Sequence, residues 1–146
     1  MVKKPVRKEN PTVKKRPNER NHPPDSSGQG PAWKFALFDP EGPFGDGHDK
    51  LARSNVIDEI LPRLRDFESM SWTEIMQGGS HSISFYNLCK EARNRLEARS
   101  LDDNDEVFSL RLTGRKRIIG IRQNHCLQIL WWDPEHQVCP ATLRHT

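Results

Sequence analysis

The sequence predicts an α+β fold with a mostly antiparallel sheet. A short strand pattern comes first, two or three helical patterns follow, and three strands linked by tight turns complete the chain. The 146 residues suffice for one compact domain. Hydrophobic residues make up only 34% and Pro occurs 11 times, which indicates a modest core with a polar segment attached.

That polar segment is residues 1–31, which hold eight basic and three acidic side chains, six prolines and almost nothing apolar. Such a segment cannot recover the entropy lost on ordering, so we expect a disordered tail and a single domain over residues 32–146. Its cations would attract any polyanion, and Lys14, Lys15 and Arg16 are the residues we expect to contact nucleic acid. A solubilising tail explains the same composition equally well.

The domain begins with residues 33–38, which alternate and predict a short strand. A loop rich in Gly and Pro follows over residues 39–50. From Asn55 to Phe67 apolar residues recur at three- and four-residue spacing, which predicts a helix. Pro62 interrupts this pattern, so either the helix kinks there or its second half begins there with proline in the first turn.

Two later helices carry explicit start signals. Ser71 followed by Glu74 is a capping box, and the glycine pair at 78–79 ends that helix after a short run. Ser84 is a second N-cap, and it opens a predicted helix whose apolar stripe extends to Leu96.

The last third of the chain predicts a three-stranded antiparallel meander. Residues 108–112 alternate, residues 117–122 form a second strand, and residues 126–132 are nearly all apolar, as expected of a strand covered on both faces. Gly114 supplies the first turn. Pro134 ends the last strand, because proline cannot donate a hydrogen bond to a neighbouring strand.

Several classes of protein are disfavoured. No apolar run could span a membrane or serve as a signal peptide, so we expect a cytoplasmic protein. Three scattered cysteines are too few for a disulfide framework. No CxxC or HExxH motif occurs, so His136 with Cys139 is a weak match to a zinc site and we expect no metal. No phosphate-binding glycine loop, nucleophile elbow or dinucleotide fingerprint is present, and we expect no cofactor.

Basic side chains gather in the predicted hairpin between the first two strands of the meander. Residues 32–106 carry a net charge of −6, whereas residues 107–146 carry +4. If the strands pair across Gly114, outward side chains converge on one face, where arginine forks match phosphate and could stabilise a pentavalent phosphorane. The alternative is the polar face of an amphipathic sheet, satisfied by the acidic helices. The basic residues are Arg111, Arg115, Lys116, Arg117 and Arg122.

The turn after the last strand carries a second group of polar side chains. Asp133, Glu135 and His136 follow a buried strand, and loops held by a rigid element often carry functional groups. Histidine transfers protons near neutral pH, and either carboxylate could orient it. A hydrogen-bonded turn without chemistry is the alternative interpretation.

In element order and in its final strands, the domain resembles the RelE/ParE superfamily of bacterial toxins, including the HigB and YoeB branches. The resemblance covers roughly residues 32–140. It implies a toxin that cuts messenger RNA on the ribosome and a separately encoded antitoxin protein that restrains it. By position, Arg111 and Arg117 are similar to the family's strand arginines, and His136 to its general acid or base. The strands that carry it are Val107-Phe108-Ser109-Leu110-Arg111-Leu112 and Ile129-Leu130-Trp131-Trp132-Asp133.

We therefore expect a metal-independent RNA endonuclease. His136 would transfer a proton to or from the attacking 2′-hydroxyl or the leaving 5′-oxygen, while Arg111 and Arg117 act on the phosphate. A non-catalytic module that binds nucleic acid or protein is the alternative from a different class, and a gyrase inhibitor of the ParE type is a third. The further nucleic-acid contacts that we expect are Arg115, Lys116 and Arg122.

Overall fold

The computed structural model describes residues 28–44, 52 and 54–140, and its α+β class is the one predicted. Residues 1–27 of the predicted tail lie outside the described residues. This part includes Lys14, Lys15 and Arg16. The helical elements are a π-helical segment η4 (Asn55–Ile60), helices α2 (Leu61–Phe67) and α3 (Trp72–Gln77), a 3-10 turn η5 (Phe85–Asn87) and helix α4 (Lys90–Ala98). The strands are β1 (Ala32–Lys34), β2 (His81–Ser84), β3 (Glu106–Thr113), β4 (Lys116–Gln123) and β5 (Cys126–Asp133).

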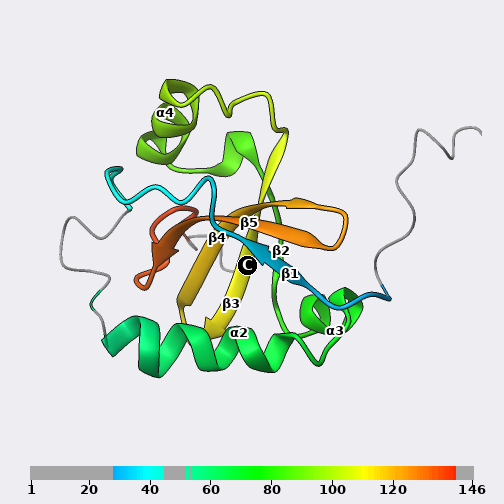
Figure 1. Ribbon diagram of the computed structural model, residues 1–146. Coiled ribbons are helices and arrows are strands. Elements are labelled where there is room, and N and C mark those ends of the chain that lie inside the picture. Colours follow the sequence, from blue (N-terminus) through cyan, green and yellow to red (C-terminus); the bar gives the residue numbers. More distant parts are fainter. Residues whose placement is uncertain (1–27, 45–51, 53, 141–146) are drawn as a thin grey trace, which may run out of the picture.

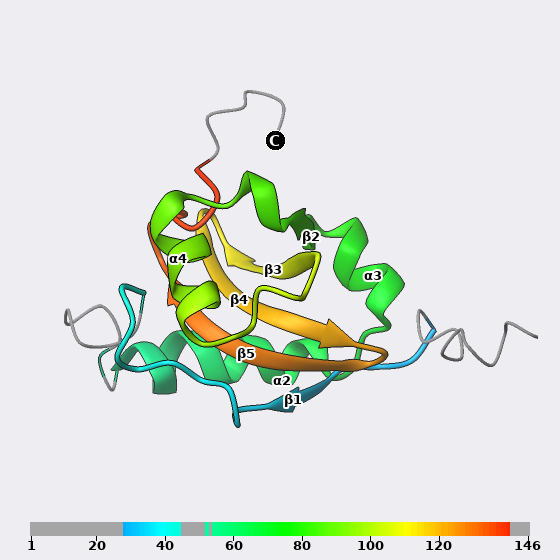
Figure 2. The same ribbon diagram turned by 90° about the horizontal axis from the view of Figure 1, so that it is seen from above.

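The five strands form one mixed sheet in the order β1-β5-β4-β3-β2. The predicted meander is present as β3, β4 and β5, which pair antiparallel through two hairpins. Two further strands enlarge it, because β2 pairs antiparallel with β3 and β1 pairs parallel with β5. Figure 1 shows helix α2 on one face of the sheet and helix α4 on the other, and Figure 2 shows the sheet from the α4 side.

Each face of the sheet packs on its own hydrophobic core. We call the face toward α4 the α4 face and the opposite one the α2 face. Alternation along the strands sends successive apolar side chains to different cores, as with Trp131 on the α4 face and Trp132 on the α2 face. A fully buried side chain of this size contributes about 2–3 kcal/mol by the burial of apolar area. Among the described residues, no helix is long and apolar enough to cross a membrane.

The start of helix α2 shows how Pro62 acts. The helix begins at Leu61 with proline in its first turn, which is the second of the two predicted alternatives. Proline has no N–H and its ring crowds the carbonyl group four residues earlier, at Asp58. Residues 55–60 accommodate this by winding more widely, and the N–H of Leu61 bonds to the carbonyl of Val56 in the π pattern.

Two predicted elements have different boundaries in the structure. The strand predicted over residues 33–38 ends at Lys34, because the chain turns immediately afterwards and the N–H of Phe38 donates to the carbonyl of Phe35. The helix predicted from Ser84 begins only at Lys90.

The later start of α4 has a tertiary cause. Residues 81–84 pair with β3, and Ser84 caps only the short turn η5. Leu88 is extended and interrupts the helical path. The apolar stripe that suggested the helix is nonetheless buried in one core, since Leu88 and Leu96 both pack on the α4 face. Pairing with the distant strand β3 therefore overrides the local residue spacing, which predicted a helix from Ser84.

The capping box that opens helix α3 is present as predicted. The hydroxyl of Ser71 accepts from the N–H of Glu74 at 3.2 Å, and the N–H of Ser71 donates to the Glu74 carboxylate at 2.9 Å. Gly79, at the end of the predicted helix, has a φ of 110°, a conformation that glycine adopts readily.

A buried ion pair fastens the loop after β1 to helix α4. The Asp39 carboxylate is 2% exposed and accepts two hydrogen bonds from Arg95, at 2.7 and 2.8 Å, and one from the Trp131 indole at 3.0 Å. Burial alone would raise the pKa of Asp39, but the bonds from Arg95 and Trp131 and the charges of Arg95 and Arg99 outweigh it and lower the pKa to about 2. Asp39 is therefore ionised in the folded protein at any ordinary pH.

A candidate phosphate-binding site on the sheet

Three charged side chains lie in one row across β3, β4 and β5. Arg111 is the cross-strand partner of Arg117, and Arg117 is the partner of Asp133. Directly paired residues share a face of the sheet. Arg117 is two residues before Ile119, whose side chain is buried on the α4 face, so alternation places the whole row on that face. The structure therefore brings Arg111 and Arg117 side by side.

The positive charges of the two arginines repel each other, and no carboxylate of the described residues is placed between them. Burial and the positive charge of Arg111 lower the pKa of Arg117, while the nearby Asp133 opposes this shift. Arg117 donates from Nη1 to the carbonyls of Gly114 and Lys116, at 2.7 and 3.1 Å, and its Nε is buried without a partner among the described residues. A bound anion would neutralise this local excess of positive charge.

Asp133 fixes the turn that follows β5. It is 2% exposed, and its carboxylate accepts hydrogen bonds from the N–H groups of Gln137 and Val138, at 2.8 and 2.9 Å. Glu135 pairs with Arg115 at 3.5 Å across the surface. The two carboxylates that were expected to orient His136 thus bond to the backbone and to Arg115 respectively.

His136 lies in this turn, three residues beyond Asp133 at the β5 end of the row. Its N–H donates to the carbonyl of Asp133 at 3.5 Å, and its φ of 61° places it in the left-handed region, which histidine adopts more often than most residues. The side chain is half-buried, with Nδ1 enclosed and without a partner among the described residues.

The predicted basic cluster does not share a single face. Arg122 lies on the α2 face, where its guanidinium carbon is 4.5 Å from the centre of the Trp72 ring. Lys116 lies on that same face and pairs with Glu59. Arg115 is exposed in the hairpin turn. The expectation that the outward cations converge was wrong for Lys116 and Arg122, because residues an odd number of positions from Arg117 on one strand point to the opposite face.

His81 is a residue that the sequence analysis did not include in the site. It begins β2 and pairs with Ser109, which is two residues before Arg111 on the same face of β3. Its Nδ1 lies 3.1 Å from the carbonyl of Gly79, and the side chain is exposed. No local signal marked it, because the segment has a single buried apolar residue, Ile83, and follows two glycines that looked like a linker.

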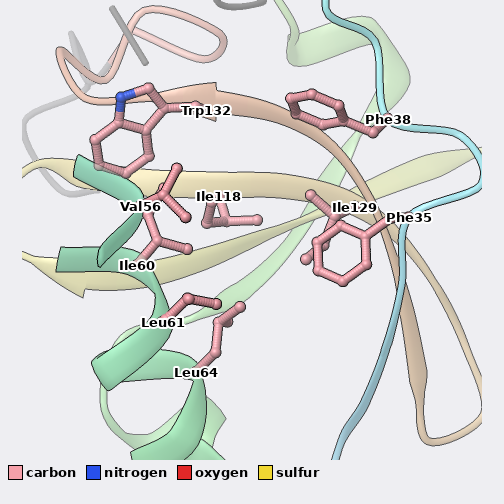
Figure 3. Close-up of a pocket in the computed structure, with 9 residues that line it drawn as sticks. All are labelled: Phe35, Phe38, Val56, Ile60, Leu61, Leu64, Ile118, Ile129 and Trp132. Atoms are coloured by element: carbon pink, nitrogen blue, oxygen red, sulfur yellow. The ribbon is translucent and has the colours of Figure 1, made fainter. Parts of the chain in front are cut away.

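The α2 face has a different kind of feature, an apolar pocket of about 200 Å³. It lies between η4–α2 and the chain after β1, with Ile129 and Trp132 of the sheet at its back (Figure 3). Phe35, which is 56% exposed, and Leu61 also line it. The described side chains that line the pocket are all hydrophobic, so they supply neither a charge for a phosphate nor a group that could transfer a proton.

Comparisons with known proteins assign no family. No protein-family model, no curated protein and no solved structure matches the chain. The resemblance to the RelE/ParE superfamily stays a prediction. Within the part of the chain that the structure describes, no three or more His, Cys, Asp or Glu side chains are grouped as metal ligands would be.

Proposed function

We propose that this protein is a metal-independent RNA endonuclease whose phosphate site is the arginine pair on the α4 face. The observation that carries it is the direct pairing of Arg111 with Arg117 on adjacent strands, with no carboxylate from the described part of the chain between them. Paired residues on antiparallel strands lie about 4.5–5.5 Å apart, so two guanidinium groups can reach one phosphate.

Arginine suits both binding and catalysis at this place. Its planar fork of donors matches the oxygens of a phosphodiester, and its charge persists at any relevant pH. The charge on phosphorus oxygens increases as a nucleophile attacks, so fixed donors stabilise the transition state more than the ground state. The hydrophobic core on the opposite face of these strands, to which Leu112 and Ile118 contribute, holds the two strands and their donors in position.

Proton transfer is assigned to His136. The turn that carries it is fixed by the Asp133 carboxylate, and Asp133 is the cross-strand partner of Arg117, so the turn follows directly on the arginine row. In this proposed function the histidine exchanges a proton with the 2′-hydroxyl or the 5′-oxygen of the cleaved linkage. A toxin with this activity requires restraint, and a separate antitoxin that covers the α4 face beside the row would supply it.

The first expected result concerns cleavage of a labelled single-stranded RNA in the presence of a metal chelator. The wild type should cut it, whereas Arg111→Ala and Arg117→Ala should each lower the rate by about 10²-fold, as expected when one donor to a transition-state charge is removed. Gel analysis of the products over time gives the rates.

Arg65→Ala is the matched control, because Arg65 is an exposed arginine of helix α2 whose one ion pair among the described residues is with its neighbour Asp66 at 3.4 Å. It should cut at the wild-type rate. RNA that the wild type binds but leaves intact would overturn the endonuclease and favour the non-catalytic binding module. Growth arrest on induced expression that both arginine variants relieve would add support for a toxin.

A further inference from the structure

We propose that His81 is the second proton-transfer group of this site and acts as its general base, with His136 as the general acid. This inference rests on the proposed RNA cleavage and assigns its reaction type. The two histidines flank the Arg111–Arg117–Asp133 row, since His81 of β2 pairs with Ser109, two residues before Arg111 on the same face, and His136 follows Asp133 at the end of β5. In-line displacement at phosphorus needs its base and its acid on opposite sides of the phosphate.

The contact to Gly79 determines which nitrogen of His81 carries a proton. A carbonyl oxygen only accepts hydrogen bonds, so the 3.1 Å contact requires Nδ1 to be the donor. In the neutral ring this leaves Nε2 with a free lone pair, which is the form that a general base needs. The side chain is exposed, so Nε2 is accessible to a strand of RNA lying on the sheet.

His81 and Arg111 are held in a fixed relation to each other. The N–H of Arg111 donates to the hydroxyl of Ser80 at 2.8 Å. The Arg111 side chain lies across Gly79, and a Cβ placed there would be 3.1 Å from its Cδ and Nη1 atoms. The glycine whose carbonyl orients His81 thus also makes room for the neighbouring phosphate-binding arginine.

The two histidines complete a balanced reaction. Nε2 of His81 takes the proton of the 2′-hydroxyl as that oxygen bonds to phosphorus, and the bond from phosphorus to the 5′-oxygen breaks. Protonated His136 gives its proton to the departing 5′-oxygen. The products are a 2′,3′-cyclic phosphate and a free 5′-hydroxyl, and no water is consumed. DNA, which lacks the 2′-hydroxyl, cannot be a substrate.

The charged groups that face these histidines come from the row and from the hairpin turn. Arg111 lies across Gly79, whose carbonyl contacts His81. Arg117 and Asp133 are on the next two strands, and Glu135, the residue before His136, pairs with Arg115. The same set of charges is present in single histidine variants. A difference in pH profile between the wild type and a single histidine variant is therefore due to the loss of that histidine.

The test is the pH dependence of kcat/KM on a short RNA, with identification of the product ends. The wild type should give a bell-shaped profile and cyclic phosphate ends. His81→Ala should lower kcat/KM by about 10²- to 10⁴-fold and remove the acidic limb, and His136→Ala should remove the alkaline limb. His125→Ala, which changes an exposed histidine in the distant β4–β5 turn, should leave both limbs unchanged.

A substrate with sulfur in place of the leaving 5′-oxygen separates the two roles, because a thiolate departs without a proton. It should restore cleavage by His136→Ala and not by His81→Ala. Cleavage by His81→Ala at the wild-type rate, alongside loss of activity in Arg117→Ala, would overturn the role of His81 and keep the proposed function. A wild type that cleaves no RNA would overturn both.

Discussion

Asp39→Ala should lower the free energy of unfolding by about 3–5 kcal/mol, because it leaves a half-buried guanidinium and a buried indole N–H without their acceptor. Arg95 and Trp131 both donate to this carboxylate, so one substitution breaks three hydrogen bonds. Urea denaturation of the variant and the wild type gives the difference. A loss of this size would show that the contact between helix α4 and the loop after β1 stabilises the folded protein.

Asp66→Ala is the control, since its pair with Arg65 is exposed and should contribute less than about 1 kcal/mol. The expected loss in Asp39→Ala also depends on pH. The pKa of Asp39 lies near 2 in the folded protein and near 3.8 unfolded, so its contribution is present above about pH 4 and is lost as pH falls through 2. Over that window the wild type should lose about 2 kcal/mol more than Asp39→Asn. Equal losses in the two proteins would contradict this role of the carboxylate.

Gly120→Ala should be the most damaging small substitution in the sheet. A Cβ at this position would lie 2.4 Å from the backbone carbonyl oxygen of Gln128 and 3.0 Å from the Leu127 side chain. The register of β4 with β5 shifts between Ile119 and Gly120, so the close approach is part of a bulge in a central pair of strands. We expect a loss of about 3 kcal/mol in the free energy of unfolding, measured by urea denaturation.

Gly114→Ala separates this collision from the general cost of replacing a glycine. Gly114 has a φ of 52°, and no atom lies within 4 Å of where its Cβ would be. The backbone strain alone should cost about 1 kcal/mol. Similar losses in the two variants would show that the contact with Gln128 is easily relieved.

The elements that the sequence predicted well are those that local chemistry determines. Ser71 and Glu74 close a capping box whatever surrounds them, and Pro62 forces a helix start through its own ring and missing N–H. The strands β2 and β1 depend instead on distant partners. His81–Ser84 has one buried residue and becomes a strand by pairing with β3, and β1 pairs with β5 almost 100 residues away.

The residues of the candidate site differ in the same respect: some positions follow from local sequence, and others depend on distant strand pairing. That Arg111 and Arg117 lie together follows from a hairpin around Gly114, a feature visible in the sequence. Alternation also separates Arg122 from Arg117, five positions apart, although the charge pattern suggested a single cluster. The place of His81 in the candidate site follows only from the strand order, because no local pattern in the sequence places a residue of β2 beside the meander.

The most direct test of the account is the affinity of the arginine pair for an RNA that cannot be cleaved. A 2′-O-methyl oligonucleotide should bind the wild type, and Arg111→Ala and Arg117→Ala should each bind it about tenfold more weakly, a loss of about 1.4 kcal/mol. Each should also reduce the slope of log Kd against log salt by about one. Arg65→Ala, which has the same net charge as the other two variants, should bind as tightly as the wild type. Equal affinities in all four proteins would contradict the assignment of the phosphate site to the α4 face.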